Sequence, residues 1–404
     1  MNSAVVSRLH SYFASIGEAL GTDRRRASFA AYAMGLLGGA ERKSVEPIAA
    51  LACADPKRVD AEHQRLLHFM VDSPWSDHEV RLVAAMYVLA AMTDREPVEA
   101  WIIDDTGFLK QGSHSVGVQR QYTGSAGKIA NCQLGTSLSV ATRTEHVPID
   151  FELYLPTSWT EDAARRREAR IPDWVVFRTR PELALEMIRR AVTDGVPPGV
   201  VLADCAYGSS RAFRDGIRAL DLHYIVAVDP QTVVAAFDKR HRPGDEVIGV
   251  RDLAFRINAA RGFRRCTWRK GTKVDLSARF ALRRVVPAYD ARKGIGKREP
   301  VWLLIEWRDG ETEPANYFFA SLNSRMTKKQ LIRLAMQRWR TERVYEDLKG
   351  ELGLDHYEGR RYPGWHHHVS VALCCYAFIV AERVRRFPPS AGRPLDTHAL
   401  ALAA

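Results

Sequence analysis

Two short apolar runs in the sequence end directly in aspartates. Trp101–Ile103 leads into Asp104, and Val200–Ala203 leads into Asp204. A carboxylate beside buried apolar residues is costly unless it has a partner or binds a metal ion. An aspartate that caps the following helix would give the same pattern, so neither residue decides between the two interpretations alone.

A third acidic residue, Glu342, lies in a segment whose apolar spacing predicts a long helix from Lys328 to about Leu352. On such a helix Arg338, Glu342, Tyr345 and Lys349 would share one face, because they are three or four residues apart. A surface ladder of ion pairs explains this spacing equally well.

The chemistry of these residues becomes specific if Asp104, Asp204 and Glu342 meet at one site. Three carboxylates can bind two Mg²⁺ or Mn²⁺ ions, because hard cations favour oxygen ligands. Two such ions can activate a water molecule or a DNA 3′-hydroxyl and stabilise the leaving oxygen in a displacement at phosphorus. The pattern therefore indicates phosphodiester cleavage and transfer.

The elements that must position these residues follow from hydrophobic spacing. Residues 1–95 contain apolar residues at helical intervals, punctuated by Gly or Pro, and this region is nearly neutral. The expected helices are His10–Leu20, Ala27–Leu37, Val45–Leu51, Glu62–Val71 and His78–Met92. We predict an all-helical N-terminal domain, whose role in DNA binding would depend on local patches that composition does not show.

The sequence changes to β-rich runs from Val98 onward. Strands are expected at Val98–Ile103, Cys132–Thr142, Val147–Leu155, Val200–Ala203 and Tyr224–Val228, with helices at Pro181–Val192 and Arg211–Leu220. The resulting order is βββαβαβ. Later apolar strands, at Val301–Trp307 and Tyr317–Leu322, either close the basic segment that precedes them or rejoin the main sheet, and a long helix follows at Trp365–Arg386.

The net charge of the chain, +11, is concentrated in one segment. Residues 239–300 carry 18 Lys or Arg and only 6 Asp or Glu. A basic block around a tryptophan is typical of a surface that binds phosphates and offers a ring for base stacking. The candidates are Arg264, Arg265, Trp268, Arg269, Lys270 and Lys273. A solvated basic face is the alternative, and core packing is the default role of Trp268.

Several stretches of the sequence resemble the DDE transposases of bacterial insertion sequences. They are IIDDTGFLKQG, SVGVQRQYTGSAGKIANCQLG, LYLPTSWTEDAARRREARIP, VLADCAYG, RWRTERVYEDLKGELGLDHYEGR and GWHHH. The resemblance runs from about Trp101 to Ala381, and residues 1–95 are similar to the helical N-terminal domain of such enzymes. It implies an RNase H-like core with a β-rich insertion between the second aspartate and the glutamate.

The resemblance also implies the metal ligands. The first aspartate of the family matches Asp104, the second matches Asp204, and the glutamate matches Glu342. Asp105 is the nearest rival of Asp104. The alternatives for the glutamate are its neighbours Glu346 and Asp347.

The tyrosine–arginine–glutamate–lysine signature of the family is matched in part. Arg338 matches its arginine and Lys349 its lysine, and both are expected to contact phosphates that flank the cleaved bond. The position of the tyrosine holds Ala335, and Tyr345 is a possible substitute.

The expected fold class is α/β: an RNase H-like mixed sheet with flanking helices, an all-α N-terminal domain and a basic β-rich insertion. The expected domains are residues 1–95, helical and a candidate for DNA binding; 98–230, first part of the catalytic core; 231–322, the insertion; 323–386, helical second part of the core; and 387–404, a tail.

The expected function is that of a transposase that binds the terminal inverted repeats of its element, cuts there with two Mg²⁺ ions, and joins the 3′-hydroxyls to target DNA. Its partners would be double-stranded DNA, at the ends and the target, and a second copy of the chain in a homodimer on DNA. The longest apolar stretch, near Val369–Val380, is shorter than a membrane span, so we expect no membrane and a cytoplasmic, nucleoid-associated protein. The competing interpretations are a metal-dependent endonuclease without strand transfer and a domesticated DNA-binding protein.

Overall fold

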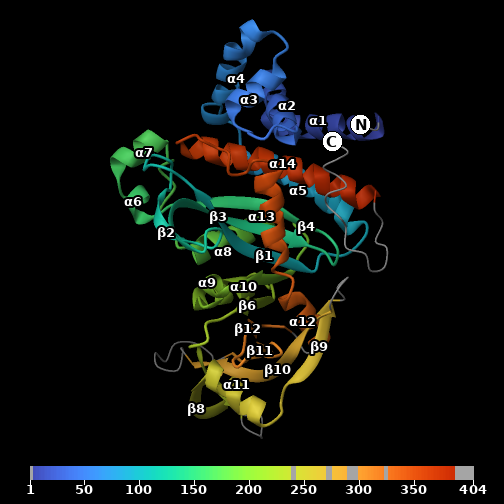
Figure 1. The fold of residues 1–404 in the computed structure, drawn as a ribbon, viewed down its shortest axis with the longest axis vertical. Helices are drawn as coiled ribbons and strands as arrows, with labels where there is room; N and C mark the ends of the chain where they lie inside the picture. The colour runs from blue at the N-terminus through green and yellow to red at the C-terminus, as the bar shows by residue number, and fades with distance from the viewer. Residues whose placement is uncertain (1–2, 238–242, 270–274, 289–298, 323–325, 387–404) are drawn as a thin grey trace. The chain divides into compact units, whose positions relative to one another are not determined.

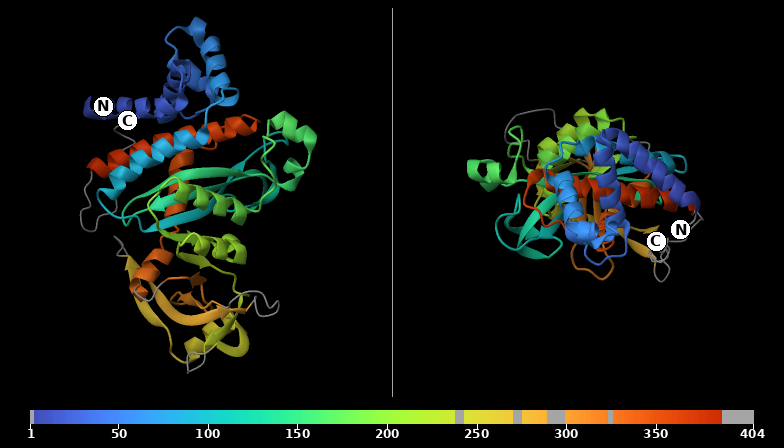
Figure 2. Two further views of the ribbon diagram at one scale, coloured as in Figure 1. Left: turned by 180° about the vertical axis from the view of Figure 1, so that it is seen from behind. Right: turned by 90° about the horizontal axis from the view of Figure 1, so that it is seen from above.

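The computed structural model describes residues 3–237, 243–269, 275–288, 299–322 and 326–386. The chain forms two compact units. Unit 1 consists of Met1–Val98, Asp104–Pro197 and Arg340–Ala404, and unit 2 of Glu99–Ile103 and Pro198–Trp339. The backbone therefore passes from one unit to the other four times. Figures 1 and 2 show the elements of each unit.

Unit 1 begins with helices at the places expected from the sequence. They are α1 (Ser3–Leu20), α2 (Asp23–Leu37), α3 (Val45–Ala52), α4 (Val59–Val71, preceded by the 3₁₀ turn Pro56–Arg58) and α5 (Asp77–Thr93). Thr22 caps α2 by accepting a hydrogen bond from the Arg25 amide, and Ser76 caps α5 by accepting one from the Glu79 amide. Apolar spacing and these caps together define the boundaries.

The longest helix of unit 1, α14 (Tyr362–Arg386), packs against α5 (Figure 1). By length and composition α14 could cross a membrane, but 94% of its apolar window is buried inside the protein. A helix that is apolar on all sides and covered on all sides is a core helix. α14 therefore connects the helical layer of unit 1 to strand β4 (His146–Tyr154) on its other side.

Three consecutive histidines on α14, His366, His367 and His368, are buried. The imidazole of His367 contacts the backbone carbonyls of Met70 and Trp75, whereas His368 lies between the Tyr32 hydroxyl and the Gly353 carbonyl. Burial lowers the pKa of both His367 and His368 to about 4. Since the histidines contact different parts of unit 1, they serve its core and do not converge on one ion.

The sheet of unit 1 is built from β1 (Ala100–Leu109), β2 (Gln119–Thr123), β3 (Lys128–Ala141) and β4. β3 pairs antiparallel with β2 through its first residues, Lys128–Cys132, and with β4 through Leu134–Ala141. The helices that follow are α6 (Thr157–Thr160), α7 (Ala163–Ala169), α8 (Arg180–Thr193) and α13 (Arg340–Gly350). The strand β2, which is short and polar, was not expected from the sequence.

Unit 2 contains the remaining strands and helices. The strands are β5 (Val200–Ala203), β6 (Tyr224–Ala227), β7 (Val233–Phe237), β8 (Pro243–Gly249), β9 (Arg264–Arg269), β10 (Leu276–Pro287), β11 (Val301–Trp307) and β12 (Asn316–Ala320). The helices are α9 (Cys205–Gly208), α10 (Arg211–Ala219), α11 (Val250–Ala259) and α12 (Lys328–Ala335). Because β12 pairs antiparallel with β6, the strands of the basic segment rejoin the main sheet.

The strand order identifies the core. Along the sheet, β4, β3, β1, β5 and β6 are neighbours in that order, and β1 contributes to both units. β5 is parallel to β1 and to β6, α8 precedes β5, and α10 precedes β6. Three meandering strands followed by two parallel strands with intervening helices make an RNase H-like mixed sheet, so the expected fold class is confirmed.

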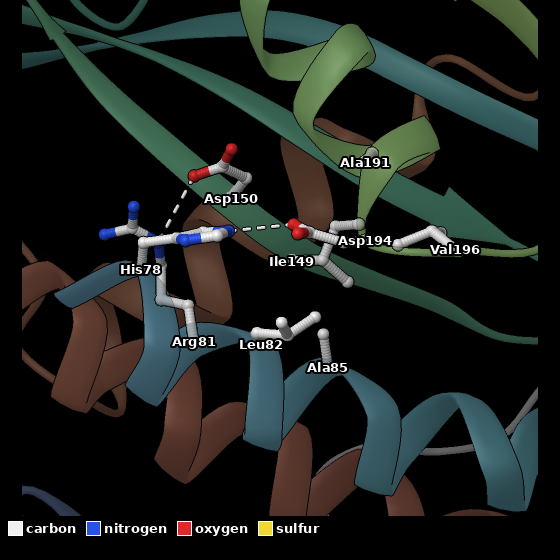
Figure 3. Close-up of a pocket in the computed structure, with 9 residues that line it drawn as sticks. All are labelled: His78, Arg81, Leu82, Ala85, Ile149, Asp150, Ala191, Asp194 and Val196. Carbon is white, nitrogen blue, oxygen red and sulfur yellow. Dashed lines mark hydrogen bonds and ion pairs between the residues drawn. The ribbon is translucent and has the colours of Figure 1, made fainter. Parts of the chain in front are cut away.

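An ion-pair network holds α5, β4 and α8 together inside unit 1 (Figure 3). Arg81 Nε lies 3.2 Å from Asp150 Oδ1, and His78 Nε2 lies 2.8 Å from Asp194 Oδ2. Burial alone would raise the pKa of Asp150, but the charges of Arg190 and Arg81 lower it on balance. These side chains line a cavity of about 20 Å³, the size of one water molecule, so the network is structural.

Candidate active site

Asp104 lies in the middle of β1. The strand continues to Leu109, so the expectation that it ends at Asp104 was wrong. The carboxylate is only 7% exposed and accepts the backbone amide of Asp105 at 3.0 Å. A carboxylate this deeply buried in an apolar strand needs favourable electrostatic partners, which is the property expected of a metal ligand.

Asp105, the rival of Asp104, is already engaged by side chains of unit 1. Its carboxylate accepts hydrogen bonds from the Thr136 hydroxyl at 2.9 Å and from the Arg180 guanidinium at 2.7 Å. These bonds account for the charge of Asp105 without a metal ion.

Asp204 has the helix-capping role that the sequence offered as one interpretation. It follows β5 directly, and its Oδ1 accepts the Ala206 amide at 2.9 Å, so it also caps the short helix α9. In the parallel pairing of β1 with β5, Ile102 is opposite Leu202. Asp104 and Asp204 each follow this pair by two residues.

Arg338 does not lie on the helix of Glu342, which corrects the expectation of one continuous helix. α12 ends at Ala335, residues 336–339 form a turn, and α13 begins at Arg340. Within unit 2, Arg338 lies near Cys205, the residue after Asp204. Burial raises the pKa of the Cys205 thiol, and the positive charge of Arg338 opposes that rise.

α13 brings Glu342 and Lys349 to unit 1. Glu342 is exposed in the first turn of the helix. The Lys349 ammonium donates a hydrogen bond to the Gly107 carbonyl at 2.7 Å and lies 5.3 Å from the centre of the Phe108 ring, and burial lowers its pKa. Gly107 is three residues beyond Asp104 on β1. Lys349 thus ties the helix of the candidate glutamate to the strand of the candidate aspartate.

Neither position considered for the family's tyrosine presents an exposed side chain. Ala335 is buried in α12. Tyr345 is buried in α13, and its hydroxyl lies 2.6 Å from the Ser137 hydroxyl. Tyr345 therefore packs α13 onto β3 inside unit 1 rather than facing a ligand.

The two alternatives to Glu342 differ in their surroundings. Glu346 is exposed and pairs loosely with Arg343, at 3.8 Å. Asp347 lies 3.5 Å from Arg343 and accepts a hydrogen bond from the Tyr376 hydroxyl at 3.3 Å. Burial raises the pKa of Asp347. Asp347 is held by its neighbours in unit 1, whereas Glu342 and Glu346 both face solvent.

The basic candidates of the insertion lie on β9. Arg264, Arg265 and Arg269 are exposed, and Arg265 pairs with Asp309 at 3.0 Å. Trp268 is half-buried and packs edge-on against the buried ring of Phe280, which is the default role considered for it. Lys270 and Lys273 lie outside the described residues.

Two residues of unit 2 were missed by the sequence reasoning. Trp339 is 44% exposed, and the Arg269 guanidinium lies 4.5 Å from the centre of its ring. Asp229 follows strand β6 much as Asp204 follows β5, and its negative charge acts on Cys205 together with that of Asp204. The sequence signal for Trp339 was its place between two arginines. The signal for Asp229 was its place shortly after an apolar strand, as for Asp104 and Asp204.

A second basic surface, the N-terminal groove, lies in unit 1. It is a cavity of about 960 Å³ between α2, α4 and the segment 357–361. Its lining includes Arg24, Arg65, Arg360 and Arg361, together with Asp72, which pairs with Arg361 at 3.2 Å. The hydroxyl of Tyr357, which also lines the groove, is buried and has no hydrogen-bond partner in the described part of the chain. The groove therefore offers positive charge, from the exposed Arg24 and Arg360, to a ligand with acceptor oxygens.

The candidate metal ligands fit a hard divalent cation by their chemistry, since all three are carboxylates. Asp104 and Glu342 belong to unit 1, and Asp204 belongs to unit 2. Within the described ranges, no group of three or more His, Cys, Asp or Glu side chains is assembled to hold a metal ion.

Comparison with known proteins identifies the class of this chain. Residues 16–274 match the family described as "DDE superfamily endonuclease", and residues 177–378 match that described as "Transposase DDE domain". The first match covers more than half of the chain, so the chain belongs to the DDE superfamily of endonucleases. The resemblance to DDE transposases of insertion sequences is therefore confirmed.

The particular relatives are transposases. The probable transposase for insertion sequence element IS701 of Microchaete diplosiphon is 29% identical over 209 residues, which are 52% of this chain and 50% of the relative. The chain thus matches about half the length of that curated relative. A piggyBac transposase, solved as a synaptic complex with hairpin DNA, is similar over 95% of this chain and 70% of its own, with a TM-score of 0.44 and 8% identity.

Proposed function

We propose that this protein is a DNA transposase that binds the terminal inverted repeats of its insertion sequence, cleaves DNA there, and joins the 3′-hydroxyl ends to target DNA. Membership of the DDE superfamily supports cleavage of nucleic acid. The relative from Microchaete diplosiphon supports strand transfer, since it is named as a probable transposase.

The observation that carries the proposal is the buried carboxylate of Asp104. Asp105 accepts hydrogen bonds from Thr136 and Arg180, whereas Asp104 is buried in an apolar strand, where its carboxylate accepts the Asp105 amide. Asp204 follows the paired strand with the same offset from the pair Ile102–Leu202. We infer that Asp104 and Asp204 act together, with Glu342 as the third ligand.

These carboxylates would hold two Mg²⁺ ions, for which Mn²⁺ can substitute, and the ions would supply an activated nucleophile and a stabilised leaving oxygen. Arg338 and Lys349 would contribute positive charge beside the carboxylates. Arg338 is suited to a bidentate phosphate contact by its planar guanidinium. Lys349 also has a structural role, because its hydrogen bond to the Gly107 carbonyl fixes α13 on β1.

DNA outside the cleavage site would be bound by two basic surfaces. The exposed arginines of β9, with Lys270 and Lys273, would grip the transposon end, and the N-terminal groove would bind a second stretch of phosphates through Arg24 and Arg360, which are both exposed. Cleavage of two ends implies a homodimer on DNA. The place of action would be the cytoplasm, at the nucleoid.

The proposal is tested with a supercoiled plasmid that carries the inverted repeats flanking the gene. Purified protein with Mg²⁺ is expected to cut at the repeat ends and to yield joined products. Asp104→Ala, Asp204→Ala and Glu342→Ala should each reduce cleavage at least about 1,000-fold, because each removes a metal ligand, while binding of the repeats stays within a few-fold. Glu346→Ala, a second exposed acid on α13, is the matched control and should cut normally.

Each outcome selects one function. Joined products support a transposase, cleavage without joining supports an endonuclease, and binding without cleavage supports a domesticated DNA-binding protein. Normal cleavage by Asp204→Ala would refute the assignment of the site. Titration of the full chain with Mn²⁺ in a calorimeter gives an independent measure, because binding at the proposed site should disappear in Asp104→Ala and persist in Glu346→Ala.

A further inference from the structure

The hairpin formed by β2 and β3 exposes two large apolar side chains side by side. Tyr122 is 64% exposed and Ile129 is 60% exposed, and the two are direct cross-strand partners in the β2–β3 register. Cross-strand partners project from the same face of a sheet. Arg120, two residues from Tyr122 on β2, projects from that face as well and is exposed. The hairpin therefore presents an aromatic ring, an aliphatic chain and a cation together.

Charge indicates what could cover this face. The sequence from Thr106 to Thr144 contains four Lys or Arg and no Asp or Glu. Lys128, at the turn of the hairpin, is exposed, and so are the turn residues Gly124 and Gly127. A segment with positive charge, no acidic residue of its own and an apolar tip suits a polyanion with stackable groups, which is DNA.

The hairpin is held firmly on the end of β1. Asn131 donates hydrogen bonds to the carbonyls of Lys110 and Gly112, at 2.9 and 2.8 Å, and accepts one from the Lys110 amide at 3.0 Å. Gly107 packs so closely on the hairpin that a Cβ there would lie 1.9 Å from Thr123 Oγ1. Tyr122 and Ile129 therefore lie on a hairpin that is anchored to β1, rather than on a loose loop.

The same support joins the strand that carries Asp104 to the helix that carries Glu342. The Gly107 carbonyl accepts hydrogen bonds from Ser125 of the hairpin, at 3.3 Å, and from Lys349 of α13, at 2.7 Å. Gly107 is three residues beyond Asp104, or about 10 Å along an extended strand. That length corresponds to about three base pairs of DNA.

We propose that the β2–β3 hairpin is a DNA wedge: Tyr122 and Ile129 enter a base step of the duplex near the cleaved phosphodiester, and Arg120 and Lys128 bind the flanking phosphates. Apolar side chains that enter a base step unstack it and bend the duplex. The wedge would open the DNA a few base pairs from the bond to be cut and so fix where the duplex lies on unit 1. This inference rests on the proposed action on DNA and adds the residues that distort the substrate.

The test uses a duplex of one inverted repeat with its flank, in which 2-aminopurine replaces one base at each position within five base pairs of the cleavage site, on both sides. The full chain is added with EDTA, so that no cleavage takes place. We expect the fluorescence to rise several-fold at one base step, because unstacking relieves quenching. The double variant Tyr122→Ser, Ile129→Ser should lose that rise and bind about tenfold more weakly.

Leu51→Ser is the matched control, because Leu51 in α3 of the same unit is also 64% exposed. It should keep both the fluorescence rise and the affinity. Arg120→Ala, Lys128→Ala should keep the fluorescence rise at saturating protein and reduce the slope of log affinity against log salt by about two. Thermal melting of all variants should match the native protein, since the substituted side chains are exposed.

The failures are distinguishable. If the native chain does not bind the duplex, the proposed function fails. If it binds but no position on either side gains fluorescence, or if the serine variant keeps the gain, the wedge is refuted and the proposed function stands. If the serine variant instead changes the sedimentation of the protein without DNA, the apolar pair is a contact between copies of the chain and the wedge is refuted.

Discussion

Asp104 and Asp105 are adjacent in sequence, yet the structure predicts opposite consequences for their removal. Asp105 accepts hydrogen bonds from Thr136 at 2.9 Å and from Arg180 at 2.7 Å, so it contributes to folding. Asp104 is buried with a carboxylate that accepts the Asp105 amide. Asp105→Ala should therefore lower stability and spare metal binding, whereas Asp104→Ala should abolish metal binding and spare stability.

The size of the effect follows from the contacts. A hydrogen bond to a charged group contributes roughly 1.5–3 kcal/mol, and Arg180 is partly exposed to water, which weakens its share. We expect Asp105→Ala to cost about 1–2 kcal/mol and to lower the melting temperature by about 2–4 °C. Loss of a metal ligand should reduce cleavage at least about 1,000-fold, which is about 4 kcal/mol of transition-state stabilisation.

Two measurements on the same preparations test this prediction. Thermal unfolding without metal reports the stability, and Mg²⁺-dependent nicking of the plasmid with inverted repeats reports the site. Cleavage should fall only in Asp104→Ala, and the melting temperature only in Asp105→Ala. The reasoning is refuted if Asp105→Ala melts normally and does not cut while Asp104→Ala cuts.

Three further predictions concern packing and pH. Gly107→Ala should melt at a lower temperature, because its Cβ would lie 1.9 Å from Thr123 Oγ1; unchanged melting in circular dichroism would contradict the tight packing. Ala335→Tyr, which restores the family's tyrosine, should destabilise the protein by about 2 kcal/mol or more in denaturant unfolding, since Ala335 is buried, and should not increase cleavage. Because folding lowers the pKa of His368 to about 4, the unfolded chain binds more protons below pH 6.5, and His368 alone should contribute a loss of about 3 kcal/mol of stability between pH 6.5 and 4; His367, with the same pKa, adds a loss of its own. His368→Gln should show a smaller loss over this pH range, and an equal loss would exclude His368 as its source.

Much of the fold could be predicted from the sequence, because its elements have strong local signals. The helices α1 to α5 show apolar spacing and side-chain caps, and β5, β6 and β11 are short apolar runs. The strand β2 was missed because QRQYT is short and mostly polar, and its partner on β3 is fixed only by the folded hairpin. Hydrophobic periodicity reveals elements that bury one face in the core, and β2 buries few of its side chains.

The candidate site was predictable in its residue types but not in its geometry. The break between α12 and α13 carries no Gly or Pro, so the sequence Met336–Trp339 gave no sign that Arg338 leaves the helix of Glu342. The choice between Asp104 and Asp105 depends on Thr136 and Arg180, which are remote in sequence. Such choices are made by tertiary contacts, which a single sequence does not display.

The two units alternate along the chain, which limits how the protein can be truncated and how its gene can recombine. The backbone crosses between the units four times, and one of the boundaries falls inside β1, between Ile103 and Asp104. No single truncation therefore releases either unit with all its strands. Deletion series would remove pieces of both at once. For the same reason neither unit is encoded by one uninterrupted stretch of the gene, so neither can be exchanged between genes as a single segment.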